Sequence, residues 1–141
     1  MSRRDALVLG SCVLMSACFS EHTTGPGDGP VSFAQDVQPF FTGSCALGGC
    51  HSNPAQPSEK PMLLTTGQAY DAIVGVASAE LPSMQRIQPG QPDQSYLIHK
   101  LQGTHQQAGG SGDRMPQGAA PASAATIAMI RRWVTEGAAR N

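Results

Sequence analysis

Cys45, Cys50 and His51 are side chains with nucleophilic or metal-ligating chemistry, and they lie within the single run CALGGCH, residues 45–51. A thiol can form a thioether, a disulfide or a bond to a metal ion, and an imidazole is a common metal ligand. Gly48 and Gly49 give the loop between the cysteines the backbone freedom it needs, because glycine adopts positive φ without steric cost. This run is the first candidate for a functional site.

Two cysteines followed at once by a histidine resemble the attachment site of a c-type haem. The resemblance implies that each thiol adds across one haem vinyl group to form a thioether. It also implies that His51 is the proximal ligand of the iron. The usual spacing places two residues between the cysteines. The four residues between Cys45 and Cys50 match a known but less common variant.

Two other interpretations of the same residues stay open. A disulfide between Cys45 and Cys50 is sterically feasible in an exported protein. A zinc site could use both thiols and His51, with His99 or His105 as the fourth ligand. Neighbouring cysteine and histidine side chains would converge poorly on one tetrahedral ion, however. The other two cysteines of the chain lie in its leader and supply no second pair.

Length and composition limit the class of protein. A chain of 141 residues is one domain with appendages. The formal net charge is −1 and there is no basic run, so nucleic-acid binding has no electrostatic support. The 16 glycines and 11 prolines favour loops, whereas 1 Trp, 2 Tyr and 4 Phe are little material for a core. A buried haem would supply an apolar centre for such a chain.

The first 17 residues resemble an export signal. Arg3 and Arg4 precede a short apolar stretch that is too short to span a bilayer, and small residues follow. Residues 15–18, Met-Ser-Ala-Cys, resemble the lipobox of bacterial lipoproteins, which implies that Cys18 is lipidated and becomes the new N-terminus. Ordinary cleavage near the same point, leaving Cys18 as a thiol, is the alternative. Residues 21–30 have almost nothing apolar to bury, so residues 18–30 are predicted to form a flexible tether and the folded domain to span 31–141.

Apolar periodicity and helix caps predict an all-α domain with four short helices and no convincing strand. The expected N-caps are Ser32, Thr66, Asp93 and Ser123. Three of the expected helices span 33 to about 41, 94 to about 101, and 124 to about 138. The remaining one follows Thr66 and carries Ala69, Tyr70, Ile73, Val74 and Ala77 on one face.

Local features refine these helices. Pro39 predicts a break or kink in the first helix, and Gly103 predicts the end of the third. The inward face of the last helix should carry Ile127, Ile130, Trp133 and Val134.

The order of these elements is similar to the small, class I-like cytochrome c fold, in which about four short helices and long loops surround one haem. In that family a first helix leads into the attachment motif and crosses a terminal helix, and a methionine-bearing loop precedes the terminal helix. Several phrases are also similar to a bacterial cytochrome c-like subgroup found in lipoproteins and larger periplasmic proteins. They are DVQP at 36–39, RIQPG at 86–90, SYL at 95–97, KLQG at 100–103, RMP at 114–116 and IRRWV at 130–134.

The resemblance implies a second axial ligand, and Met115 before Pro116 is the expected one. A thioether ligand favours ferrous iron, so His/Met ligation raises the reduction potential. His105 and His99 are the alternatives, and a bis-His site would have a lower potential. Met62 and Met129 lie among apolar residues and are expected to fill the core.

Arg86 precedes a Pro-Gly turn and could pair with a haem propionate. Together these features predict a membrane-tethered monohaem c-type cytochrome on the periplasmic side of a bacterial membrane. It would carry single electrons between transient redox partner proteins and would not be an enzyme. An open sixth iron position, which would make it a small-ligand-binding haem protein, is one alternative. A haem-free exported lipoprotein with a Cys45–Cys50 disulfide is the other.

Overall fold

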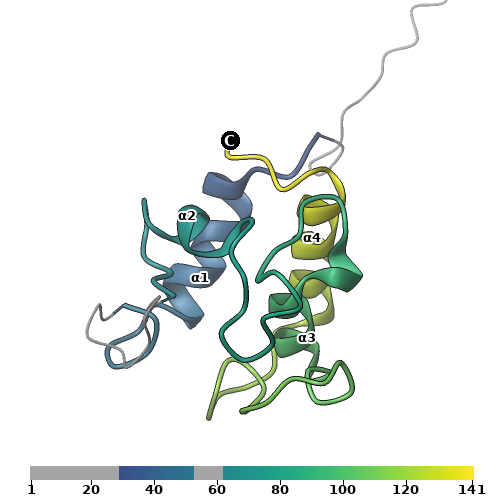
Figure 1. Cartoon of the computed structure of the whole chain (residues 1–141). Helices are drawn as coiled ribbons and strands as arrows, with labels where there is room; N and C mark the ends of the chain where they lie inside the picture. Colours follow the sequence, from purple (N-terminus) through teal and green to yellow (C-terminus); the bar gives the residue numbers. More distant parts are fainter. Residues whose placement is uncertain (1–28, 53–61) are drawn as a thin grey trace, which may run out of the picture.

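The computed structural model describes residues 29–52 and 62–141, and in these residues the chain forms four α-helices and no β-strand (Figure 1). The leader, Cys18 and most of the expected tether lie outside the described residues. The helices are α1 (Gln38–Ser44), α2 (Ala69–Ile73), α3 (Tyr96–Gln102) and α4 (Ala124–Thr135). The predicted all-α class with four helices is confirmed. Within the described part, no helix has the length and apolar character needed to cross a bilayer.

The first predicted helix consists of two parts. A π-helix, η1 (Phe33–Val37), starts after Ser32, whose hydroxyl accepts a hydrogen bond from the Gln35 backbone N–H at 3.2 Å, as its N-cap role predicts. The chain then becomes α1, with Pro39 in its first turn, where a missing N–H breaks no helical hydrogen bond. The predicted break therefore falls at Val37, and the helix continues to Ser44 instead of ending near Phe41.

The second predicted helix is too long, and its predicted cap is wrong. α2 begins after Gln68, not after Thr66, and ends at Ile73. Val74 is extended and pairs with Ile87, and the following Gly75 has a φ of +70°. Backbone pairing with a distant loop thus replaces the last turns that the apolar pattern predicts.

The third predicted helix starts later than expected. Asp93 lies inside a 3₁₀ turn, η2 (Pro92–Gln94), and Ser95 precedes α3. The Ser95 hydroxyl is buried and donates to the Gln91 carbonyl at 3.0 Å, which holds the chain extended before the helix begins. Gly103 ends α3 with a φ of +77°, as predicted.

The fourth predicted helix is confirmed at its start. Ser123 accepts a hydrogen bond from the Thr126 N–H at 3.0 Å, and Ile130, Trp133 and Val134 are fully buried. α4 ends at Thr135, earlier than predicted, because positive φ at Gly137 and Ala138 turns the chain.

Aromatic side chains join η1 to α4. The Phe33 ring lies 5.2 Å from the Trp133 ring and 5.3 Å from the Tyr70 ring, the latter edge to face. The two ends of the described chain also meet, because Asn141 accepts hydrogen bonds from the Phe33 and Ala34 backbone N–H groups. Figure 1 shows α1 and α2 on one side and α3 and α4 on the other, with the C-terminus beside the start of the described chain.

Candidate haem-binding site

A cavity of about 420 Å³ lies between the 45–51 loop, α3 and the segment before α4. This volume falls within the roughly 300–1,000 Å³ typical of small-molecule and cofactor sites. All five cofactor-site residues predicted from the sequence line it: Cys45, Cys50, His51, Arg86 and Met115. Its walls also carry apolar side chains, including those of Phe41, Leu64, Leu97 and Leu101.

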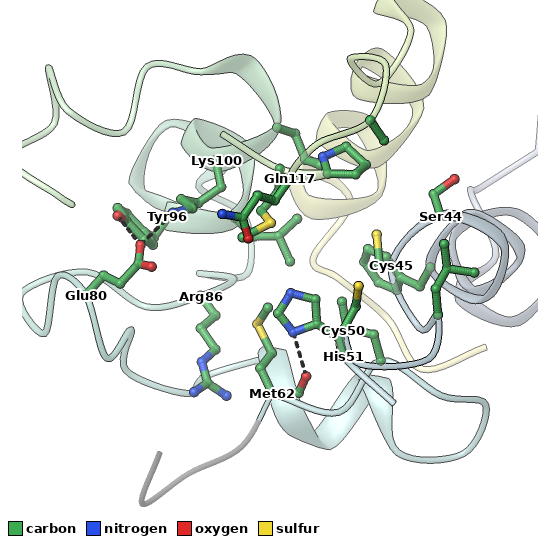
Figure 2. Close-up of a pocket in the computed structure, with 18 of the residues that line it drawn as sticks. Ser44, Cys45, Cys50, His51, Met62, Glu80, Arg86, Tyr96, Lys100 and Gln117 are labelled. Atoms are coloured by element: carbon green, nitrogen blue, oxygen red, sulfur yellow. Dashed lines mark hydrogen bonds and ion pairs between the residues drawn. The ribbon is translucent and has the colours of Figure 1, made fainter. Parts of the chain in front are cut away.

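The loop between the two cysteines is a closed turn. Cys45 follows directly after α1, and its carbonyl accepts a hydrogen bond from the His51 N–H at 3.0 Å. Inside this turn the Cys50 N–H donates to the Leu47 carbonyl at 2.9 Å, and Gly49 has a φ of +81°. A left-handed residue therefore accommodates the wider spacing, and both cysteines reach the same cavity (Figure 2).

His51 is held in one tautomer by the backbone. Its Nδ1 lies 3.1 Å from the Met62 carbonyl oxygen, which can only accept, so Nδ1 carries the proton. Nε2 then has the free lone pair that a metal requires, and a carbonyl on the other nitrogen is the usual way such a ring is oriented. Burial lowers the pKa of His51, which keeps the imidazole in its neutral, ligating form.

The two cysteines are thiols in different environments. Cys45 is buried, and burial raises the pKa of its thiol to about 11, with the neighbouring Cys50 adding to the rise. Cys50 is exposed. No disulfide joins them in the structure.

Met115 is the only one of the three predicted candidates for the second axial position whose residue lines the cavity. His99 is oriented by Thr104 Oγ1 at 2.8 Å on Nδ1 and by the Asp93 carbonyl at 3.0 Å on Nε2. His105 is buried and donates from Nε2 to the Gly112 carbonyl at 2.9 Å. Both histidines therefore have structural roles that hold them away from the cavity.

One end of the cavity is charged. Arg86 and Lys100 are both buried, at 6% and 7% exposed, and Glu80 lies beside Lys100 (Figure 2). Lys100 Nζ is 2.7 Å from Glu80 Oε2, and Arg86 donates to the Ala72 carbonyl at 2.7 Å. Burial lowers the pKa of Arg86. Arg86 and Lys100 thus place two buried cationic side chains in the wall of the cavity.

Sequence reasoning did not identify Glu80, the role of the Met62 carbonyl, or the bonds that join Glu80 to Tyr96 and Lys100. Met62 lies among the apolar residues as predicted, yet it also lines the cavity and supplies the carbonyl that orients His51. Glu80, Tyr96 and Lys100 form a hydrogen-bonded group at the charged end. Burial, and then the bond to Glu80, raise the pKa of Tyr96 to about 12. Glu80 lies 16 and 20 positions from Tyr96 and Lys100, and no local sequence pattern reports bonds over that separation.

The donor set fits a c-type haem. It contains two thiols, an imidazole with a free Nε2, a thioether and a buried guanidinium around one apolar cavity. In residues 29–52 and 62–141 no group of three or more His, Cys, Asp or Glu side chains lies placed to hold a metal ion. No protein-family model, curated protein or solved structure matches this chain.

Proposed function

We propose that this protein is a monohaem c-type cytochrome that carries single electrons outside the cytoplasm and adopts a class I-like cytochrome c fold. One observation carries the proposal. The sequence predicts five residues for this chemistry, and all five line one cavity: Cys45, Cys50, His51, Arg86 and Met115. Arg86 and Met115 lie 35 and 64 positions after His51 (86 − 51 and 115 − 51), and both still reach the cavity that the 45–51 run lines.

Each residue has a role in holding the cofactor. Cys45 and Cys50 would supply the two thiols for thioether bonds, and the His51 Nε2 and the Met115 thioether would be the two ligands of the iron. Arg86 would pair with a propionate. When bound, a haem supplies the one-electron couple, while fixed ligands on the protein keep reorganisation small. Electron transfer of this kind needs no pocket for a substrate.

The chain outside the described residues has a separate role in the proposal. Lipidation of Cys18 and a flexible tether over 18–30 would attach the domain to the periplasmic side of a bacterial membrane. The domain could then reach redox partner proteins along that surface. A Cys18→Ala variant should leave the membrane fraction, and retention there would refute the anchor without touching the haem proposal.

Haem staining of a denaturing gel tests the core of the proposal. The chain is exported in a host with c-type haem maturation, beside a cytochrome known to mature there. A stained band at the mass of polypeptide plus one haem is expected, and the Cys45→Ser, Cys50→Ser double variant should not stain. An unstained band beside a stained control cytochrome would refute the proposal and favour the disulfide-linked lipoprotein.

The axial ligand has its own test. Met115→Ala should abolish the methionine–iron charge-transfer absorption and let the ferrous protein bind carbon monoxide. Met84→Ala is the matched control, because Met84 does not line this cavity. Unchanged absorption in Met115→Ala would remove Met115 from the iron. Rapid carbon monoxide binding by the unmodified protein would favour an open-site haem protein.

A further inference from the structure

The segment that carries Met115 is fixed to α3 by a partly buried polar group. Tyr96 Oη donates to Glu80 Oε2 at 2.8 Å and accepts from the Ser111 N–H at 3.2 Å. Lys100 Nζ donates to the same Glu80 oxygen at 2.7 Å and to the Ser111 carbonyl at 3.2 Å. Glu80 thus links two residues of α3, and both of them hold Ser111.

The same segment is shaped to lie against this group. A Cβ at Gly110 would be 2.3 Å from Tyr96 Oη, and a Cβ at Gly112 would be 2.8 Å from Glu80 Oε1. Both distances are far below van der Waals contact, so only glycine permits this approach. The segment is packed onto Tyr96 and Glu80.

The contact continues to Met115 itself. The Met115 N–H donates to the Lys100 carbonyl at 3.0 Å, so one residue of α3 holds the segment through both its side chain and its backbone. Tyr96 and the Lys100 side chain are 4% and 8% exposed, whereas the Glu80 side chain is 38% exposed. Tyr96 and Lys100 therefore make their hydrogen bonds largely shielded from water, and such bonds hold a loop more firmly than exposed ones.

We propose that Tyr96, Glu80 and Lys100 are positioning residues that fix segment 109–116 on α3 and thereby hold the Met115 thioether at the cavity. The ligand part of this inference rests on the proposed function. The three residues act through Met115 and form no bond to the cofactor. Without these three residues, segment 109–116 would lose conformational freedom each time the Met115 thioether bound the iron. Because that loss opposes binding, the thioether would leave the iron more often.

Hydrogen exchange on the exported chain as isolated tests the positioning. Tyr96→Phe removes one hydroxyl and keeps the ring, and Glu80→Gln removes the shared charge at a partly exposed site. Each should speed exchange of the Ser111 and Met115 amides by about tenfold, a change of about 1.4 kcal/mol in local opening. Amides of α4 should keep their protection, which shows that the variants are folded.

Asp93→Asn is the matched control, because it removes a carboxylate from an exposed ion pair with Arg131. Unchanged exchange at Ser111 and Met115 in both variants, relative to this control, would overturn the proposal. In the haem-loaded protein the variants should also weaken the methionine–iron absorption and raise carbon monoxide affinity. Faster exchange with unchanged absorption and affinity would likewise overturn it.

The two proposals can fail separately. An unmodified protein that carries no haem contradicts the proposed function, and the exchange comparison alone then decides whether the group orders the segment. A haem-bearing protein whose variants all exchange like the control contradicts only the positioning role.

Discussion

Replacing Gly110 with alanine should destabilise the protein, although alanine suits its backbone. Gly110 does not have a positive φ, so the added methyl group causes no conformational strain. The new Cβ would lie 2.3 Å from Tyr96 Oη, 2.5 Å from Cε2 and 2.7 Å from Cζ. Ordinary contact begins at 3.4 Å, so the ring itself must move by about an ångström.

The loss of stability in Gly110→Ala follows from the hydrogen bond between Tyr96 and Glu80. A shift of that size stretches its 2.8 Å bond to the Glu80 carboxylate beyond hydrogen-bonding range. A hydrogen bond to a charged group contributes about 1.5–3 kcal/mol. Loss of unfolded-state freedom on replacing glycine by alanine returns about 0.4–1 kcal/mol. The net destabilisation should be about 1.5 kcal/mol, or about 0.8 M in the urea midpoint for an m-value of about 2 kcal/mol/M.

Gly43→Ala supplies a control with the opposite sign. Gly43 lies inside α1 and does not have a positive φ, and a Cβ added there would meet no heavy atom within 4 Å. Alanine there should raise stability by about 0.5–1 kcal/mol, since glycine is costly inside a helix. Urea unfolding of the exported protein, followed by circular dichroism, measures both. A Gly110→Ala midpoint equal to or above that of the unmodified protein would refute the packing argument.

Three further predictions concern the core, a thiol and an acid group. Trp133→Ala should cost about 3–5 kcal/mol because the side chain is fully buried, and an unfolding midpoint near that of the unmodified protein would contradict this. In chain that has not received haem, Cys45 should be alkylated far more slowly than Cys50, and its rate should rise about tenfold per pH unit up to a pH of about 11; equal rates for the two thiols would contradict its burial. The hydrogen bond from the Val31 N–H, followed by Arg132, lowers the pKa of Glu136 below its usual 4.5. Its stabilising effect is therefore complete above that pH and lost as the pH falls through the lower folded value, and Glu136→Gln should flatten the acid side of the stability curve.

Helix ends set by neighbouring residues could be predicted from the sequence. Ser32 and Ser123 each cap the start of a helix through a side-chain oxygen, as expected. Gly103 ends a helix through its positive φ, also as expected. All three act within a few residues of their own position. The helix expected after Thr66 was overestimated, because its last turns compete with backbone pairing between Val74 and a loop that sequence periodicity does not report.

The cavity was partly predictable for a related reason. The cysteines and His51 are close together in sequence, and the family resemblance supplied Met115. The bonds that join Glu80 to Lys100, twenty positions away, depend on how α3 packs and leave no local pattern. The same is true of Asn141, whose contacts with the first described residues span more than 100 positions.

The first described residues lie beside the last ones, so the described fold begins and ends at one place. Arg132 binds the Gly29 carbonyl at 2.7 Å, Glu136 accepts from the Val31 N–H at 2.7 Å, and Asn141 bonds to Phe33. Entry and exit of the chain therefore occupy one place on the surface. A domain of this kind can be spliced into a surface loop of a host protein through short linkers without stretching its own fold. The same geometry would allow its ends to be joined and the chain to be reopened elsewhere.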